Sequence, residues 1–243
     1  ATLRAWDLSQ SSCLWALQGH ADALRCLVVD WHYSQAITGS ADNCAIVWNP
    51  ISGKAFHTLS GHRGSVQCID ISCVRQRAIS GSADGTLKVW NLRSGACDST
   101  LTGHEGKVRC VIANWQDMQA VSCSCDDTII LWDISCAAQL RSFLGHDDSV
   151  HTLLVDWSIA RILSSSADET LRLWDVRTGS CLHVLQGHLN SVHTMCVDWT
   201  SLRALSGSYD GTMRLWDLSD GSCSHVSSAR IAAGASISAN FLS

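Results

Sequence analysis

The chain has 243 residues, of which 46% are hydrophobic and 16% are charged, with a single proline. This composition supplies enough apolar side chains for a core and excludes an intrinsically disordered chain. The formal net charge of −5 provides no general attraction to nucleic acid or anionic membranes, and no apolar run reaches the roughly 18 residues that span a bilayer. We therefore expect a folded intracellular protein, in the cytoplasm or the nucleus, that binds neither a membrane nor nucleic acid.

Residues 1–18 predict two strands, one ending in Trp6-Asp7 and one over residues 13–17, separated by a polar turn. From Gly19 onward each unit predicts four strands. In the unit that begins at Gly61, alternating and β-branched residues place these strands at 66–71, 77–82, 86–90 and 96–101.

The second and third strands of each unit are joined by a tight turn that begins with Asp. Asp84-Gly85 suits such a turn, because glycine adopts positive φ without steric cost and Asp bonds to the local backbone. Asp126-Asp127 and Asp168-Glu169 stand in its place in two units. We expect these two turns to be less relaxed.

Three residue types recur every 42 residues without an insertion. The tryptophans are Trp6, Trp48, Trp90, Trp132, Trp174 and Trp216. Gly-His pairs end at His20, His62, His104, His146 and His188, and the turn carboxylates are Asp42, Asp84, Asp126, Asp168 and Asp210. Self-similarity at this period is typical of a β-propeller built from four-stranded blades.

The register divides the chain into two partial units, 1–18 and 229–243, around five complete ones at 19–60, 61–102, 103–144, 145–186 and 187–228. We expect one domain over residues 1–243. Residues 235–241 align with 109–115 as a single strand, and pairing it with 1–18 would close a partial sixth blade without leaving unpaired edges. The alternative is a fragment of a propeller with seven or more blades. The sequence does not separate these two alternatives.

Gly-His, an Asp in a tight turn and Trp-Asp, repeated at this spacing over residues 2 to about 227, resemble the WD40 repeat family. The resemblance implies an all-β propeller of antiparallel blades that assembles other proteins and is not an enzyme. It also implies one buried polar network in each blade, where an imidazole, a hydroxyl, a carboxylate and an indole satisfy one another. The implied networks are His20, Thr38, Asp42, Trp48; His62, Ser80, Asp84, Trp90; His104, Ser122, Asp126, Trp132; His146, Ser164, Asp168, Trp174; and His188, Ser206, Asp210, Trp216.

Neither catalysis nor metal binding is expected. A Ser-His-Asp triad needs one exposed nucleophile, whereas five equivalent sets describe a repeated scaffold, and no Gly-x-Ser-x-Gly motif occurs. Cys123 and Cys125 have no Cys-x-x-Cys pair to complete a zinc site. We expect no metal, no cofactor and no small-molecule substrate.

Two further series predict packing rather than chemistry. The thirteen cysteines are odd in number and often repeat-equivalent, so we expect free thiols that act as small buried hydrophobes: Cys26, Cys68 and Cys110 in one register, and Cys13, Cys97, Cys181 and Cys223 in another. A second tryptophan series, Trp31, Trp115, Trp157 and Trp199, is expected to pack against neighbouring blades.

Partner choice must come from positions that differ between repeats. In the WD40 resemblance these positions ring one face around the central channel, and here they carry cations without carboxylates. We expect an acidic or phosphorylated peptide or protein as partner, held by arginine contacts and an aromatic edge. The alternative is a substrate-recognition or regulatory module of a larger enzyme assembly, such as a ubiquitin ligase or a signalling NTPase. The predicted partner-binding residues are Arg25, Arg63, Gln67, Lys107, Arg109, His151, His193 and Tyr209.

Overall fold

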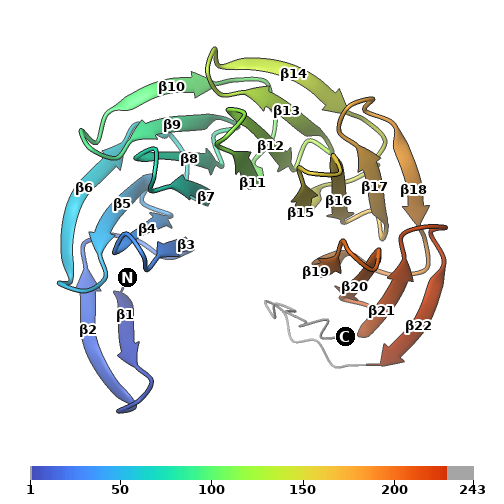
Figure 1. Cartoon of the computed structure of the whole chain (residues 1–243), viewed down its shortest axis with the longest axis horizontal. Coiled ribbons are helices and arrows are strands. Elements are labelled where there is room, and N and C mark those ends of the chain that lie inside the picture. Colours follow the sequence, from blue (N-terminus) through green and yellow to red (C-terminus); the bar gives the residue numbers. More distant parts are fainter. Residues whose placement is uncertain (1, 229–243) are drawn as a thin grey trace. The chain divides into compact units, whose positions relative to one another are not determined.

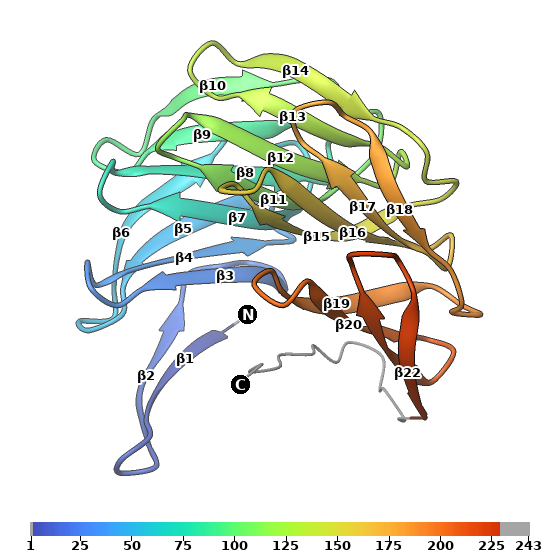
Figure 2. The ribbon, with the colours of Figure 1, turned by 45° about the vertical axis from the view of Figure 1, so that its right-hand side comes forward.

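The computed structural model describes residues 2–228, and within this range every regular element is a strand. The first two, β1 (Thr2–Asp7) and β2 (Ser12–Gln18), form an antiparallel hairpin (Figure 2). The other strands form five four-stranded sheets, in which strands consecutive in sequence are hydrogen-bonded neighbours (Figure 1). The prediction of an all-β chain with four-stranded antiparallel blades is confirmed.

Each sheet corresponds to one predicted 42-residue unit. The first two contain β3 (Leu24–Asp30), β4 (Gln35–Ser40), β5 (Cys44–Asn49) and β6 (Lys54–Ser60), then β7 (Val66–Ser72), β8 (Arg77–Ser82), β9 (Leu87–Asn91) and β10 (Cys97–Leu101). The third contains β11 (Val108–Asn114), β12 (Gln119–Ser124), β13 (Ile129–Asp133) and β14 (Ala138–Phe143). The last two contain β15 (Val150–Asp156), β16 (Arg161–Ser166), β17 (Leu171–Asp175) and β18 (Cys181–Leu185), then β19 (Val192–Asp198), β20 (Arg203–Ser208), β21 (Thr212–Asp217) and β22 (Cys223–Ser228).

The chain divides into two compact units. The first holds Ala1–Ala120 with Trp132–Gln139, and the second holds Val121–Leu131 with Leu140–Ser243. In the first unit the leading strands β3, β7 and β11 lie side by side, and in the second unit β15 lies beside β19. The single domain over residues 1–243 stays a prediction. The expected strand at 235–241 lies outside the described residues, so the pairing of the two termini also stays a prediction.

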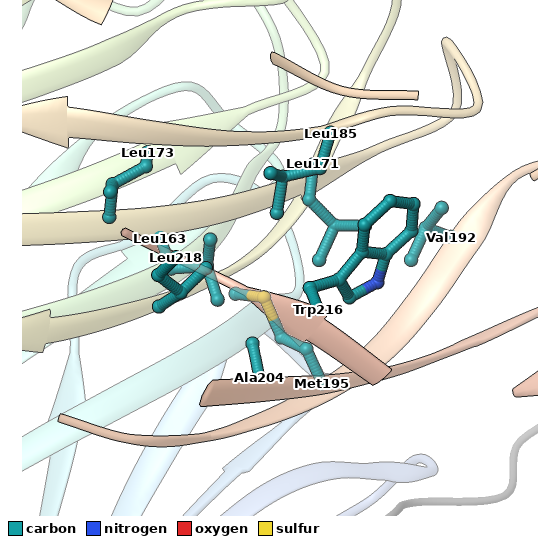
Figure 3. Close-up of a cluster of buried hydrophobic side chains, with 9 residues drawn as sticks. All are labelled: Leu163, Leu171, Leu173, Leu185, Val192, Met195, Ala204, Trp216 and Leu218. Carbon is teal, nitrogen blue, oxygen red and sulfur yellow. The ribbon is translucent and has the colours of Figure 1, made fainter. Parts of the chain in front are cut away.

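Neighbouring sheets of one unit pack through apolar side chains. Figure 3 shows such a core in the second unit, where side chains of β16–β18 meet those of β19–β21 around Trp216. Trp216 is 1% exposed and is surrounded by residues that include Leu171, Leu185 and Val192. An equivalent cluster around Trp90 joins β3–β6 to β7–β9 in the first unit. The indole of the Trp-Asp or Trp-Asn strand is therefore a central packing residue as well as a hydrogen-bond donor.

The turn before the third strand requires positive φ at its second residue in every complete repeat. Gly85 and Gly211 have φ of 79° and 78°, and Asp127 and Glu169 occupy the same conformation at 66° and 70°. A left-handed backbone costs a residue with a Cβ about 1 kcal/mol or more, a cost that glycine avoids. The expectation of less relaxed turns at these two positions is confirmed.

Two packing expectations need correction. All thirteen cysteines are free, but Cys13, Cys97, Cys181 and Cys223 are exposed rather than buried. Cys97, Cys181 and Cys223 begin the fourth strand of their sheets, and Cys13 lies near the start of β2. Each of these strands is an edge of its sheet, which leaves the thiols exposed. Trp199 packs against the apolar core of the second unit as expected, whereas Trp31 is 68% exposed. Equal position in the repeat therefore does not ensure equal burial.

Candidate functional site

A hydrogen-bonded network connects four side chains in the repeat at residues 145–186. His146 lies in the segment before β15, Ser164 on β16, Asp168 in the following turn and Trp174 on β17. Trp174 Nε1 donates to Ser164 Oγ at 2.9 Å, and Ser164 Oγ lies 2.7 Å from His146 Nε2. His146 Nδ1 lies 2.6 Å from an oxygen of Asp168. The network thus fixes a loop, a strand and a turn to one another.

The order of donors in this network determines the state of the histidine. The indole is only a donor, so Ser164 Oγ accepts from it. The hydroxyl proton has two acceptors within reach, His146 Nε2 at 2.7 Å and the carbonyl oxygen of Arg172 at 3.3 Å, and we assign it to the shorter contact with His146. Nδ1 then carries the imidazole proton and donates to the ionised Asp168. Every polar atom along this path has a partner, with a neutral imidazole at its centre.

The same arrangement occurs in three other repeats. His–Asp distances are 2.8, 3.0 and 2.8 Å for His20–Asp42, His62–Asp84 and His188–Asp210. The matching hydroxyls of Thr38, Ser80 and Ser206 each lie 2.8 Å from the histidine Nε2 and from the tryptophan Nε1. In the repeat at 103–144, the rings of His104 and Trp132 meet edge to face at 6.0 Å, Ser122 is buried, and Asp126 accepts bonds from Thr128.

These networks have the connectivity of a Ser-His-Asp catalytic triad, yet their burial suits a different role. Ser164 has no exposed surface, and its oxygen already accepts the Trp174 N–H. An attacking hydroxyl must reach a substrate carbonyl, so a fully covered serine is badly placed for nucleophilic catalysis. We therefore interpret the networks as structural: they hold the strands and the turn of a blade together.

Acidification is expected to destabilise the fold in two steps. Burial lowers the pKa of His62 and His188 despite the opposing effect of Asp84 and Asp210. The unfolded chain therefore binds more protons as the pH falls below the ordinary histidine pKa of about 6.5, and the free energy of unfolding decreases. Burial alone would raise the pKa of Asp84, but hydrogen bonds from Thr86 and the Arg63 backbone outweigh it and lower this pKa to about 2.

The stability contributed by Asp84 is present above its unfolded pKa of about 3.9 and is lost as the pH falls toward about 2. Urea unfolding followed by tryptophan fluorescence should show a first decline from about pH 7 to 5 and a second below about pH 4. A free energy of unfolding that stays constant down to about pH 5 would contradict the neutral-histidine assignment.

A β-bulge interrupts the leading strand of four repeats, next to these networks. In β3 the pairing with β4 shifts between Leu24 and Cys26, so that Arg25 is an extra residue without a partner across the ladder. The same shift leaves Gln67 unpaired in β7, His151 in β15 and His193 in β19. Bulges of this kind redirect a side chain and are frequent beside functional sites. Four of the eight predicted partner-binding residues are therefore bulge residues.

The first unit contains the cationic part of the predicted surface. Arg25, Gln67 and Arg109 occupy equivalent positions on the neighbouring strands β3, β7 and β11. Arg25 is exposed, Arg109 is partly exposed, and the Arg109 Nε is buried without a hydrogen-bond partner within the described residues. Arg63 is exposed and Lys107 is partly exposed in the segments before β7 and β11.

The second unit contains the aromatic part of the predicted surface. The rings of His151 and His193 stack with centroids 4.2 Å apart, and the ring of Tyr209 follows at 3.8 Å from His193. His151 Nε2 also lies 2.9 Å from Ser191 Oγ, and Tyr209 is 45% exposed. The sequence predicted that these three residues belong to the partner-binding surface, but it did not predict that their rings are in contact. The available signal was that both histidines occupy the same register in adjacent repeats.

Residues 2–228 contain no cluster of three or more His, Cys, Asp or Glu side chains arranged to hold a metal ion. Nor does this part of the chain contain a helix whose length and hydropathy would suit it to cross a membrane.

Comparison with known proteins yields a repeated family match. A family model described as "WD domain, G-beta repeat" matches residues 11–49, 53–91, 95–133, 137–175 and 179–217, which together make up more than half of the chain. Each matched segment ends one residue after a tryptophan of the 42-residue series. No curated protein matches the chain.

Proposed function

Because the chain belongs to the WD40 repeat family, whose repeats generally mediate protein–protein interaction, we propose that it binds protein or peptide partners as a non-catalytic scaffold. Domains of this family are typically non-catalytic scaffolds. The buried Ser-His-Asp networks support this role, because their serine hydroxyls and imidazoles are buried and already hydrogen-bonded to one another.

The observation that carries the proposal is the bulge in the leading strands. The β-bulge is the same in four repeats, whereas the residue at the bulge differs: it is Arg25, Gln67, His151 or His193. A bulge residue is released from the pleat of its strand and can point toward a ligand. A repeated backbone with a variable side chain is suited to recognition, because the fold does not dictate the residue at that position.

The chemistry of the first unit favours an acidic or phosphorylated partner. Arg25, Arg63, Lys107 and Arg109 supply positive charge, and arginine forms paired hydrogen bonds with carboxylate or phosphate. In the second unit the stacked rings of His151 and His193 and the adjoining, tilted ring of Tyr209 supply an aromatic surface, of the type enriched at protein interfaces. The location inside the cell and the absence of a small-molecule substrate stay predictions.

Affinity capture from cell lysate with quantitative mass spectrometry tests the proposal. The bait is the chain itself, compared with a double variant, Arg25→Glu and Arg109→Glu, and with a control, Arg93→Glu and Arg177→Glu, which makes the same charge change in turns outside the predicted surface. We expect the first variant to lose partners that the control retains. Capture of the same proteins at the same yield by both variants would exclude the cationic surface. If the lost partners are subunits of one enzyme assembly, the chain is its recognition module.

A further inference from the structure

Two grooves in the structure occupy equivalent positions of the repeat, 84 residues apart. The first has a volume of about 590 Å³, lies in the first unit, and is lined by Arg75, Arg77, Asp98, Met118, Ile134 and Ser135. The second has a volume of about 490 Å³, lies in the second unit, and is lined at the same positions by Ile159, Arg161, Leu182, Leu202, Leu218 and Ser219. One backbone arrangement therefore carries two different linings.

The two grooves differ chiefly in charge. Ile159 stands where the first groove has Arg75, and Leu182 stands where it has Asp98. In the second groove Arg161 is neutralised by Asp175 at 2.6 Å and also donates to backbone carbonyls. The position of Asp175 is occupied by the uncharged Asn91 in the first groove, where Arg77 pairs instead with Asp98.

Arg75 is left as the uncompensated charge of the first groove. It is exposed, and it makes a long hydrogen bond, 3.4 Å from Nη2 to the carbonyl oxygen of Gln116. Within residues 2–228 no carboxylate pairs with it. By contrast, Arg141 in the second unit donates to two carbonyl oxygens at 2.7 and 3.1 Å. A guanidinium has five N–H donors, so most of those on Arg75 remain available.

We infer that this groove binds a single carboxylate of a peptide, supplied by an Asp or Glu side chain. Two guanidinium groups and one carboxylate give the lining one net positive charge, which a monoanionic carboxylate balances and a doubly charged phosphate exceeds. Arg75 can hold a carboxylate through two parallel N–H···O bonds. The partly exposed Met118 supplies an apolar contact for the stem of the acidic side chain or its neighbour, whereas Ile134 beside it is only 3% exposed.

This site is separate from the partner-binding surface proposed above. Arg75 lies in the turn after β7, whereas the bulge residue Gln67 lies near the beginning of that strand. The two ligands would meet opposite ends of the same strand. Binding in the groove can therefore fail or succeed independently of the capture experiment.

The test is a titration of the isotope-labelled chain with short blocked peptides, followed through the Nε–Hε NMR signal of Arg75. The probes are acetyl-Leu-Glu-Leu-amide, its uncharged counterpart acetyl-Leu-Gln-Leu-amide, and acetyl-Leu-phosphoserine-Leu-amide. We expect the Glu peptide to shift the Arg75 signal saturably at millimolar concentration and to bind at least about tenfold more tightly than the Gln peptide.

Two variants are provided by the repeat itself. Arg75→Ile installs the residue that the second groove already has, so the fold is expected to accept it, and Glu-peptide binding, followed by signals of Met118 and Ile134, should weaken by about tenfold or more. Ile159→Arg should confer carboxylate binding on the second groove. Thermal unfolding of each variant checks that the fold is retained.

Several results would overturn the inference. These are equal binding of the Glu and Gln peptides, undiminished Glu-peptide binding by a folded Arg75→Ile variant, and no saturable shift in the parent chain. Binding of the phosphoserine peptide about tenfold tighter than the Glu peptide would overturn the carboxylate assignment in favour of a phosphate site.

Discussion

Replacing Asp168 with alanine is expected to lower the free energy of unfolding by about 3 kcal/mol. One oxygen of this buried carboxylate lies 2.6 Å from His146 Nδ1 and accepts the backbone N–H of Asp147 at 3.2 Å. The other accepts the N–H and hydroxyl of Thr170 at 2.9 and 2.7 Å. The truncation would leave the buried His146 without its acceptor and release the turn that Thr170 holds. Equilibrium urea unfolding measures the loss.

An asparagine at the same position separates charge from shape. Both oxygens of Asp168 face donors, and an amide nitrogen cannot accept a hydrogen bond, so Asp168→Asn should also be clearly destabilising. Asp220→Ala, at an exposed turn of the second unit, is the matched control and should leave stability nearly unchanged. Full stability of Asp168→Asn would mean that the donors around this carboxylate are wrongly assigned.

Trp216→Ala is expected to be the most damaging single substitution, with a loss of about 4 kcal/mol. The indole fills the apolar core between two sheets of the second unit, and its Nε1 donates to Ser206 at 2.8 Å (Figure 3). The alanine variant would lose both the packing and the buried hydrogen bond. Trp216→Phe retains most of the ring volume but leaves Ser206 without this donor, and should cost about 1 to 2 kcal/mol.

Trp6 provides a control from the same 42-residue series. It is 54% exposed on β1, so Trp6→Ala should reduce stability by less than about 1 kcal/mol. Thermal and urea unfolding of Trp216→Ala, Trp216→Phe and Trp6→Ala measure the three effects together. A large loss at Trp6 would show that this indole is covered in solution, as the predicted pairing of residues 235–241 with the first strands would require.

Much of the fold could be predicted from the sequence because each blade is specified by local sequence patterns that recur in every repeat. In the unit at Gly61 the expected strands 66–71 and 77–82 differ from β7 and β8 by one residue at most. Alternating side chains define strands, and the Asp-Gly turn defines the hairpin between them, so no distant contact is needed to recognise a blade. The burial of individual residues was less predictable. Cys97 and Trp31 are exposed although both belong to repeat-equivalent series.

The candidate site, too, was only partly predictable from the sequence. Repetition identified the positions that vary between blades, including Arg25, His151 and His193, because a recognition surface on a repeated scaffold must use such positions. It did not show the bulges that carry these residues, since a one-residue change of register depends on how two strands pair rather than on either strand alone. The contact of the His151, His193 and Tyr209 rings likewise depends on the packing of adjacent repeats.

By itself the sequence determined the family, the all-β class and the members of each buried network, because residue type and a constant 42-residue spacing carry that information. Only the tertiary structure decided which residues each network joins at hydrogen-bonding distance and which equivalent positions are covered. It also decided that Arg75 has no carboxylate partner among residues 2–228, whereas Arg161 has Asp175. The physical reason is that burial and charge pairing are set by neighbours far apart in the chain. Asp175 in the second groove and Asn91 in the first are equivalent positions of the repeat. This single difference in charge changes the chemistry of two grooves that share one backbone arrangement.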